Sequence, residues 1–373
     1  MTGRGGRVAG VAVAAAVAVV LGAGPALADP APPGGGGGGG GGGLTAEEQA
    51  LEPLVAQLQQ QYQQVETATE KYDGLDERLT AAQKLGARLQ QQLTQLKAQV
   101  ETGRTVAAGL ADAQYRNQGV SQLGELILSD NPYQAANLAS MLASAARSQG
   151  LFLRRLHQQE QQLAATTAQA EAGLAQVRRL TVEARQQKAA VQKQLAASER
   201  SLAGLTGAQL SQIKLLEQRQ ADQAQLAFLA TGVLGKGGGN PSALGRQAVS
   251  YAFAQLGKPY LWGGNGPKAY DCSGLTQQAW LAAGVQIPRT SQEQWAQLRH
   301  VPLNALRPGD LIVYFAHATH VAMYIGDGKV VEAPHTGAYV EVAPIAADPV
   351  LGAVRPDPAS AGLSSYSLPP QNK

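Results

Sequence analysis

Cys272 is the only cysteine in this chain of 373 residues. It lies in the segment Asp271-Cys272-Ser273-Gly274-Leu275, at the start of a stretch that predicts a short helix ending at Gly284. Exported proteins that use cysteines structurally normally contain an even number of them. A single thiol is therefore buried and inert, bonded to another chain, or kept for chemistry. The dipole and free N–H groups at a helix start favour the thiolate, so this position predicts a nucleophile.

A thiol nucleophile needs an imidazole to take its proton and a polar group to orient that imidazole. The chain has five histidines. His320 begins an apolar strand that would hold its backbone rigidly, so we expect it to be the base. A zinc site formed by His317, His320 and His335 is an alternative, although the ligand spacing typical of zinc sites is missing. The other two, His157 and His300, fit surface positions.

The turn after this strand decides which residue orients His320. Gly326-Asp327-Gly328 predicts a hairpin between two apolar strands. A two-residue turn, Asp327-Gly328, would pair His320 with His335. A three-residue turn would instead place Glu332 on the face of His320, diagonally adjacent. The residues alone leave both partners open, with His335 otherwise lining the cleft.

Several residues near Cys272 could bind a substrate or a reaction intermediate. Tyr260 could donate its phenol to a developing oxyanion beside the Cys272 N–H, or it could pack against Trp262. Asp271 suits a helix N-cap. Three further residues are candidate substrate contacts, although caps and turn hydrogen bonds explain them nearly as well: Ser273, Arg289 and Ser291.

The elements that would position these residues occupy the last third of a segmented chain. Arg4 and Arg7 precede an apolar run, and Ala26-Leu27-Ala28 fits a signal-peptide cleavage site, so we expect export and a mature start near Asp29. Ten consecutive glycines follow from Gly34. The predicted segments are a signal peptide (1–28), a flexible Pro/Gly-rich tether (29–43), a helical hairpin (44–234), a Gly-rich linker (235–242), a compact domain (243–357) and a disordered tail (358–373).

The hairpin is predicted from two apolar stripes with spacings of three and four residues, which are typical of coiled-coil seams. Glycines such as Gly103 interrupt the pattern between them, so we expect the helices to fold back antiparallel around a tip at about 103–150. The first stripe includes Leu51, Val55, Leu58, Tyr62, Val65, Thr69 and Tyr72, and the second runs from Leu156 through Leu174 to Leu205.

The compact domain places helices before antiparallel strands, which predicts the α+β class. The formal net charge of the chain is only +3. Nucleic acid is therefore not an implied partner. The candidate residues form a nucleophile, base and polar-group set that requires neither a metal nor another cofactor.

Three motifs, in this order and spacing, resemble the NlpC/p60 cell-wall peptidases. They are Asp271-Cys272-Ser273-Gly274-Leu275, Pro308-Gly309-Asp310-Leu311-Ile312 and the segment from His320 to Gly326. Tyr260, twelve residues before the cysteine, and Pro288-Arg289-Thr290-Ser291 match as well. The resemblance covers about residues 243–357. It implies a papain-like α+β fold in which helices pack on an antiparallel sheet.

The resemblance also implies roles and a substrate. Cys272 would be the nucleophile, His320 the base and acid, and Glu332, twelve residues later, the third residue; many relatives carry histidine there. The family hydrolyses peptide stems of peptidoglycan, commonly between D-glutamate and the following diamino acid, which implies a secreted, cell-wall associated protein. With this spacing added to the three-residue turn, we expect Glu332 rather than His335 to orient His320.

The amino-terminal coil is similar to long hairpins of exported peptidases in this family that act in cell division. Such hairpins are thought to block the cleft or to dock on a membrane activator, and either role is possible for residues 44–234. An exported coiled-coil adaptor with a catalytically silent peptidase domain is the competing function. The intact set of Cys272, His320 and Glu332 argues against it.

Overall fold

The computed structural model describes residues 46–116, 124, 131–235 and 239–370, with side chains from residue 49 onward. The predicted signal peptide and tether lie outside the described residues, as does most of the centre of the expected hairpin tip. None of the described helices is both long enough and apolar enough to cross a membrane.

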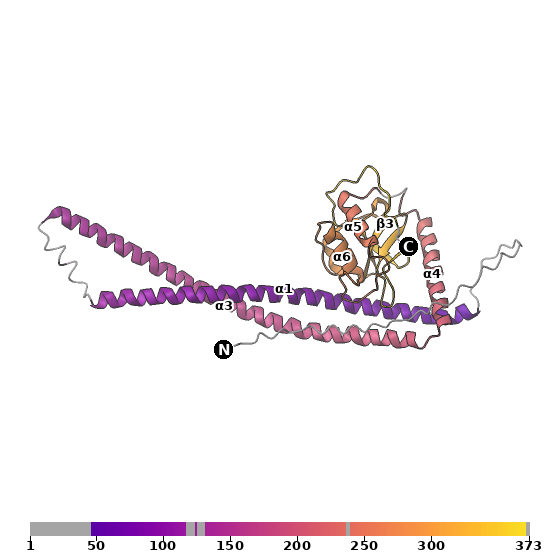
Figure 1. The fold of residues 1–373 in the computed structure, drawn as a ribbon, viewed down its shortest axis with the longest axis horizontal. Coiled ribbons are helices and arrows are strands. Elements are labelled where there is room, and N and C mark those ends of the chain that lie inside the picture. The colour runs from indigo at the N-terminus through magenta and orange to yellow at the C-terminus, as the bar shows by residue number, and fades with distance from the viewer. Residues whose placement is uncertain (1–45, 117–123, 125–130, 236–238, 371–373) are drawn as a thin grey trace. The chain divides into compact units, whose positions relative to one another are not determined.

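Helices α1 (Ala46–Arg116) and α3 (Pro132–Ala203) form an antiparallel hairpin (Figure 1). Leu, Ala, Gln and Glu dominate both helices, and these residues lose little side-chain freedom in a helix. Side-chain hydrogen bonds join residues whose separation in the sequence shrinks along the pair, as an antiparallel arrangement requires: Gln61 with Ser201, Gln159 with Gln99, and Gln114 with Gln149.

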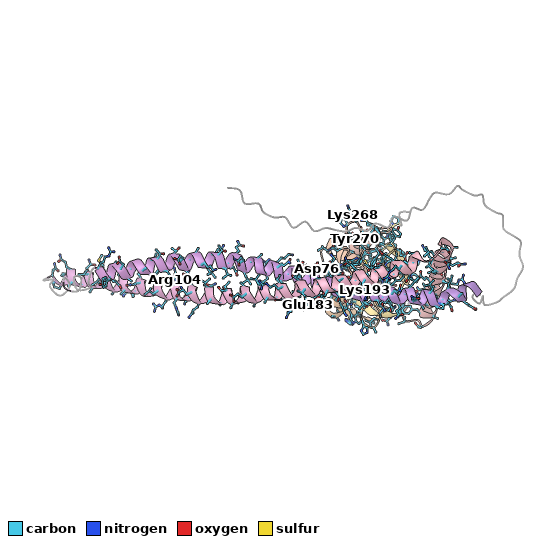
Figure 2. The ribbon with its side chains drawn as sticks, turned by 90° about the horizontal axis from the view of Figure 1, so that it is seen from below. Asp76, Arg104, Glu183, Lys193, Lys268 and Tyr270 are labelled. Carbon is cyan, nitrogen blue, oxygen red and sulfur yellow. The ribbon has the colours of Figure 1, made fainter. Side chains whose placement is uncertain are left out.

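The seam of the hairpin follows most of the predicted apolar stripes. Leu174 departs from the pattern, because its side chain is 54% exposed. Charged side chains such as Arg104 and Lys193 lie exposed along the outside of the hairpin (Figure 2). The buried apolar side chains of the seam are Val55, Leu58, Val65, Leu89, Leu93, Leu96, Val100, Leu156, Leu180, Ala184 and Val191.

The two helices extend well into the region expected to form the tip, at about 103–150. Helix α1 continues through Gly103 to Arg116, and α3 begins at Pro132. A Cβ atom on Gly103 would lie only 2.6 Å from Cδ1 of Leu156. The sequence pattern indicated that this glycine interrupts the helix. In the structure the helix continues through it, and the missing side chain allows α1 and α3 to approach closely.

The second arm of the hairpin does not run to residue 234 as one helix. It ends at Ala203, and a separate helix, α4 (Gly207–Ala230), follows. Thr206 and Gln209 form a capping box at its start: the Gln209 N–H donates to Thr206 Oγ1 over 3.3 Å, and the Thr206 N–H donates to Gln209 Oε1 over 2.9 Å. The chain changes direction there because these caps satisfy the exposed backbone groups.

Three short helices precede the strands of the compact domain. They are α5 (Ala243–Phe253), α6 (Cys272–Ala282) and α7 (Ser291–Gln297). The side chain of the preceding residue caps each one by accepting a backbone N–H: Ser242, Asp271 and Thr290.

A six-stranded sheet with the order β1-β6-β2-β3-β4-β5 forms the rest of the domain, and every neighbouring pair is antiparallel. Helices packed on this sheet confirm the predicted α+β class. The strands and one short 3-10 helix are β1 (Arg299–Val301), η1 (Leu303–Ala305), β2 (Leu311–Tyr314), β3 (His320–Gly326), β4 (Lys329–Glu332), β5 (Glu341–Pro344) and β6 (Val350–Arg355).

Both faces of the sheet are buried, as the alternation along β2 shows. Leu311 and Val313 belong to the core shared with α5 and α6. Ile312 and Tyr314 belong to a second core, against which Phe228 of α4 packs. A strand with apolar residues at every position fits this two-sided burial.

Helix α4 is attached to the compact domain by a polar contact as well. Gln225 donates to the backbone oxygen of Gly328 over 2.9 Å and accepts the N–H of Ala346 over 3.1 Å. Helix α4, which the sequence analysis assigned wholly to the hairpin, therefore contacts the domain predicted at 243–357, while a hydrogen bond from Gln59 to Gln220 also joins it to α1.

The tail expected to be disordered from residue 358 is held against the domain over its first part. The Arg307 guanidinium donates to the oxygen of Ser360 over 2.7 Å, and the Leu363 N–H donates to the oxygen of Pro241 over 2.8 Å. The segment has no regular secondary structure. Its backbone hydrogen bonds, rather than a helix or strand, fix its position.

Candidate active site

Cys272 is the first residue of α6. Asp271 precedes it in an extended conformation, and its Oδ1 accepts the N–H of Gly274 over 2.6 Å. The cap fixes the start of the helix and leaves the thiol at its N-terminus, where the sequence predicted it. Cys272 is only 2% exposed.

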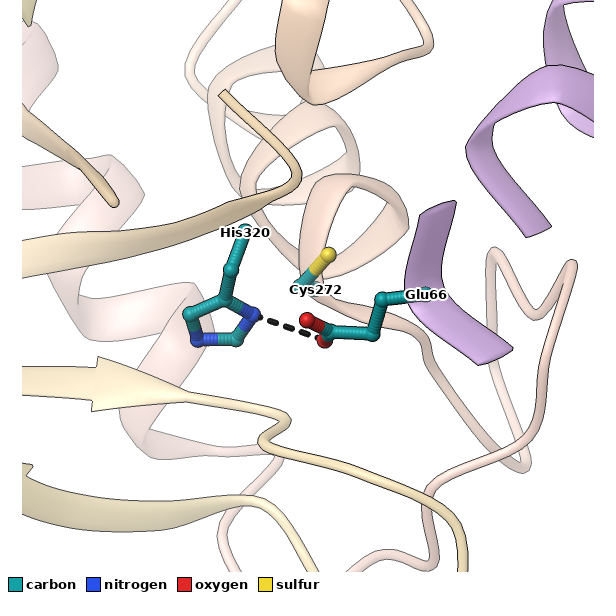
Figure 3. Close-up of side chains that lie close together, drawn as sticks. All are labelled: Glu66, Cys272 and His320. Atoms are coloured by element: carbon teal, nitrogen blue, oxygen red, sulfur yellow. Dashed lines mark hydrogen bonds and ion pairs between the residues drawn. The ribbon is translucent and has the colours of Figure 1, made fainter. Parts of the chain in front are cut away.

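His320 is the first residue of β3, and its ring is buried. Its Nε2 atom lies 2.6 Å from Oε2 of Glu332, at the end of β4. A carboxylate at this distance accepts the Nε2–H proton, so Nδ1 is the ring nitrogen left to accept or hold a second proton. This nitrogen faces the side on which Cys272 lies (Figure 3).

A β-bulge brings Glu332 to His320. The turn is a two-residue turn: Gly326 pairs with Lys329, and Asp327 and Gly328 have φ values of 52° and 65°. Such a turn was expected to select His335. The ladder then shifts between Tyr324 and Gly326, and further on Met323 pairs with Val331. The extra residue restores the register of a three-residue turn, which places Glu332 diagonally across from His320.

Tyr260 and His335 lie on either side of this pair. Tyr260 is buried in the same core as Cys272, and burial, followed by the charge of Glu66, raises the pKa of its phenol well above the ordinary value. His335 does not contact His320 through a hydrogen bond. Its Nδ1 lies 3.0 Å from the oxygen of Thr336, in the loop that follows β4.

A buried polar network surrounds Asp271, Ser273 and Arg289. Arg289 donates two hydrogen bonds to the Asp271 carboxylate, of 3.1 and 2.5 Å, and one of 2.8 Å to Ser273 Oγ. Burial alone would lower the pKa of Arg289, but Asp271 and then Asp73 hold it above its ordinary value. Ser291 Oγ donates to the oxygen of Ala318 over 2.7 Å, which fixes the start of α7. These contacts explain why all four side chains are rigid.

Helix α1 inserts two glutamates into this site. Glu66 Oε1 lies 2.9 Å from Nδ1 of His320 (Figure 3). Glu70 accepts hydrogen bonds from Ser273 Oγ over 2.7 Å and from the Ser291 N–H over 2.6 Å. Its Oε1 also lies 3.7 Å from the Cys272 sulfur. The helix therefore occupies the space in front of the thiol and the imidazole.

Contacts on both sides of these glutamates extend the docking surface of α1. Asp73 pairs with Arg289 over 3.0 Å. The ring of Tyr62 stacks on His335 with centroids 3.9 Å apart. The ring of Tyr72 meets Trp262 edge-on at 5.3 Å. Tyr62 and Tyr72, which the apolar stripe placed in the hairpin seam, thus face the compact domain, and the Tyr72 ring contacts the Trp262 ring expected to pack with Tyr260.

The docked helix reverses the expected ionisation of the nucleophile. The helix start was expected to lower the thiol pKa, but burial, and then the charge of Glu70, raises the pKa of Cys272 well above its ordinary value. Burial also raises the pKa of Glu66 and of Glu70 to about 7. For His320, burial lowers the pKa, but Glu66 more than offsets this and holds it well above the ordinary value. The docked arrangement therefore disfavours a free thiolate.

Sequence reasoning missed the α1 residues, although a signal exists. Tyr62, Glu66, Glu70 and Asp73 recur at intervals of four, four and three, so they lie on one helical face. The three acids are at most 5% exposed. Acidic residues aligned with a tyrosine, next to a continuous apolar seam, indicate a second contact surface rather than a solvated face.

The alternative zinc site of three histidines does not form in the described part of the chain. His317 is exposed, and His335 is engaged by Tyr62. Of the three, His320 lies with Cys272 and Glu66 instead (Figure 3).

Comparison with known proteins places this domain. Residues 257–351 match the model of the NlpC/P60 family. The probable endopeptidase Cgl2188 of Corynebacterium glutamicum is 45% identical over 92 residues, which cover 25% of this chain and 44% of that protein. The peptidoglycan endopeptidase RipA of Mycolicibacterium smegmatis is 35% identical over 139 residues, which cover 32% of this chain and 28% of that protein.

Among solved structures, an NlpC/P60 family protein from Bacillus cereus shares 32% identity, with 32% of this chain and 42% of that chain covered and a TM-score of 0.30. The chain thus spans less than half the length of each of these relatives.

Proposed function

Because its carboxy-terminal domain belongs to the NlpC/P60 family, we propose that this protein is a cysteine endopeptidase that cleaves the stem peptides of peptidoglycan. The observation that carries the proposal is the chain of contacts from Cys272, at a helix start, to His320 and from its Nε2 to Glu332 over 2.6 Å. A nucleophile, a base and an orienting carboxylate are the parts that thiol acyl transfer needs.

In the proposed reaction, Nδ1 of His320 takes the thiol proton and the Cys272 sulfur attacks the peptide carbonyl carbon. The Cys272 N–H and the Tyr260 hydroxyl would donate to the oxyanion. The C–N bond then breaks, His320 returns the proton to the leaving amine, and water hydrolyses the thioester. The proposed bond joins D-glutamate to the following diamino acid. The proposed location is the cell wall, after export.

We also propose that the described structure is an inhibited form of this enzyme. Glu66 and Glu70 stand where a substrate would have to approach His320 and Cys272, and the thiol is only 2% exposed. A hydrolase that attacks the wall of its own cell needs such restraint. Removing α1 would remove both carboxylates from the thiol and leave the helix start and His320 to lower its pKa.

Release of α1 would break its contact with α4, where Gln59 donates to Gln220, but would keep the contacts of α4 with the sheet. Gln225 and Phe228 make those contacts, and the capped junction at Thr206 begins α4 as a helix separate from α3. We propose that a membrane or division partner binds the hairpin and withdraws α1, with residues 204–206 as the pivot. The contacts that must break are chiefly polar, which suits a reversible restraint.

A charge reversal on α1 tests the function and the restraint together. Glu70→Lys places a cation beside Arg289, so it should release α1 and increase both hydrolysis of purified peptidoglycan and labelling of Cys272 by at least about tenfold. Glu101→Lys, on an exposed position of the same helix, is the matched control and should leave both rates unchanged. Cys272→Ala in the Glu70→Lys background should abolish hydrolysis while the domain remains folded.

Two results would contradict these proposals separately. Equal labelling and hydrolysis in the wild type and Glu70→Lys would mean that α1 does not limit access to the thiol. Faster labelling of Glu70→Lys without any release of wall fragments would instead support the adaptor with a silent peptidase domain.

A further inference from the structure

Three side chains of different chemical type meet in front of β3. They are Glu66 of α1, Cys272 at the start of α6, and His320 at the start of β3 (Figure 3). Each offers one donor atom, and the three atoms lie within 4.8 Å of one another. All three residues are buried. A carboxylate oxygen, a sulfur and an imidazole nitrogen therefore converge on one point from three elements.

The orientation of the imidazole suits a metal ligand. Its Nε2–H is directed to Glu332 over 2.6 Å, which leaves the Nδ1 lone pair facing Glu66 Oε1 at 2.9 Å. Histidines that bind metals almost always donate their other ring N–H to a carboxylate or carbonyl, which fixes the tautomer and increases the basicity of the ligating nitrogen. Glu332 occupies that outer position here.

The charges around this point also favour a cation. The deprotonated Glu66 and Nδ1 of His320 are both acceptors, so without a cation a proton must lie between them. Glu70 adds a second carboxylate 3.7 Å from the sulfur. Arg289, the nearby guanidinium, is already engaged by Asp271, Ser273 and Asp73. A positive ion at the donor triad would take the place of the proton that these buried acceptors share and would offset the charge of the carboxylates around it.

The donor types select the ion. Calcium and magnesium prefer oxygen ligands throughout. A thiolate, an imidazole and a carboxylate form a mixed set typical of zinc, which binds at about 2.0 to 2.3 Å and accepts three protein ligands with a water in the fourth position. Oε1 of Glu66 lies 2.9 Å from Nδ1, so the Glu66 side chain would have to rotate to admit the ion between them.

We propose that the closed protein binds one zinc ion through Glu66, Cys272 and His320, and that this ion locks α1 over the active site. The proposal rests on the proposed function, in that the docked helix inhibits the thiol. Binding releases the thiol proton and the proton between Glu66 and His320, and nothing is oxidised or reduced. Because one ligand comes from α1, zinc binds the closed form more tightly than the open form, and by linkage stabilises it.

Zinc affinity of the full chain tests the site through Glu66. Purified zinc-free protein is titrated with zinc chloride in competition with a chromogenic chelator, using the wild type, Glu66→Gln, Cys272→Ala and Glu77→Gln. The amide of Glu66→Gln keeps the shape and hydrogen bonding of the closed helix but is a poor ligand. Glu77, exposed on the same helix, is the matched control.

We expect one zinc per chain in the wild type and in Glu77→Gln, an affinity at least about tenfold weaker in Glu66→Gln, and no binding at this site in Cys272→Ala. Cobalt substituted for zinc should give a thiolate-to-metal charge-transfer band that Cys272→Ala lacks. Equal zinc affinity in the wild type and Glu66→Gln would overturn the proposal, because the ion would then not depend on α1.

Hydrolysis by the Glu70→Lys protein, measured beside these titrations, separates this proposal from the proposed function. Loss of zinc affinity in Glu66→Gln, with no hydrolysis by zinc-free Glu70→Lys, would support the metal site and contradict the endopeptidase. Hydrolysis by the Glu70→Lys protein that is unaffected by zinc, with equal affinities in the wild type and Glu66→Gln, would contradict the zinc lock alone.

Discussion

At the scale of single residues, the roles of Glu332 and His335 depend on one extra residue in β3. Each could orient His320 on sequence grounds, and the two-residue turn by itself favours His335. The bulge between Tyr324 and Gly326 shifts the register by one position and brings Glu332 to 2.6 Å from the imidazole. A single inserted residue in a strand therefore exchanges which side chain meets the catalytic candidate.

This geometry predicts an order of effects. In the Glu70→Lys background, Glu332→Ala should lower the rate of peptidoglycan hydrolysis about 100-fold or more, because the imidazole loses the group that orients its proton. Glu332→Gln should retain part of the rate through a surviving hydrogen bond. His335→Ala removes only the ring that stacks on Tyr62 and should have a smaller effect. A more severe loss in His335→Ala than in Glu332→Ala would mean that His335, and not Glu332, orients His320.

At the scale of elements, α1 carries out two packing tasks on different faces. One face forms the seam with α3, and another presents Glu66, Glu70 and Asp73 to the compact domain. A helix with only a seam would leave those acids in water. These acids are at most 5% exposed. The position of the hairpin therefore decides which charged groups surround Cys272 and His320.

The close approach of α1 and α3 gives a prediction with an internal control. In Gly103→Ala the new Cβ would meet Leu156 at 2.6 Å, whereas no atom lies within 4 Å of the same position at Gly109. We expect Gly103→Ala to destabilise the hairpin by about 1 kcal/mol or more. Gly109→Ala should stabilise it by about 0.5 to 1 kcal/mol through helix propensity.

Thermal unfolding followed by circular dichroism would measure both changes in the full chain. Equal stabilisation by the two substitutions would mean that Leu156 moves aside without cost and that the glycine is not required for packing.

At the scale of the whole molecule, docking of α1 is linked to proton uptake. Asp73 faces Arg289, Asp271 and Glu70, and burial, followed by the charge of Asp271, raises its pKa from 3.8 to about 8 in the closed form. The closed form thus binds a proton on this carboxyl more readily than the open form does. Closure is therefore favoured at low pH, and this contribution is lost as the pH rises toward about 8.

The Cys272 labelling rate of the wild type divided by that of Asp73→Asn isolates this effect, because the same thiol titrates in both proteins. With a chelator present, we expect the ratio to rise between about pH 6 and pH 8.5, by no more than about tenfold per unit for a single proton. Asp76→Asn, exposed on the same helix, should follow the wild type. A ratio that stays constant across this range would mean that Asp73 does not restrain α1 through its proton.

The sequence by itself determined the features that depend on local patterns. Cys272 begins a helix because Asp271 caps it, and the strand beginning at His320 follows from an apolar run and a Gly-rich turn. The α+β class and the long helical hairpin follow from the order of the elements and the period of the apolar residues. Each of these inferences uses residues that are neighbours along the chain, where propensity and spacing act directly.

Only the tertiary structure decided how distant segments meet. Glu66 and His320 are 254 residues apart, and no local pattern specifies their contact. Helix α4 contacts the sheet through Phe228 and also contacts α1, where Gln59 donates to Gln220, and no local pattern specifies this double contact. Burial, and then the charge of Glu70 from α1, raises the pKa of the Cys272 thiol in this form, and that depends on packing rather than on the residues next to Cys272.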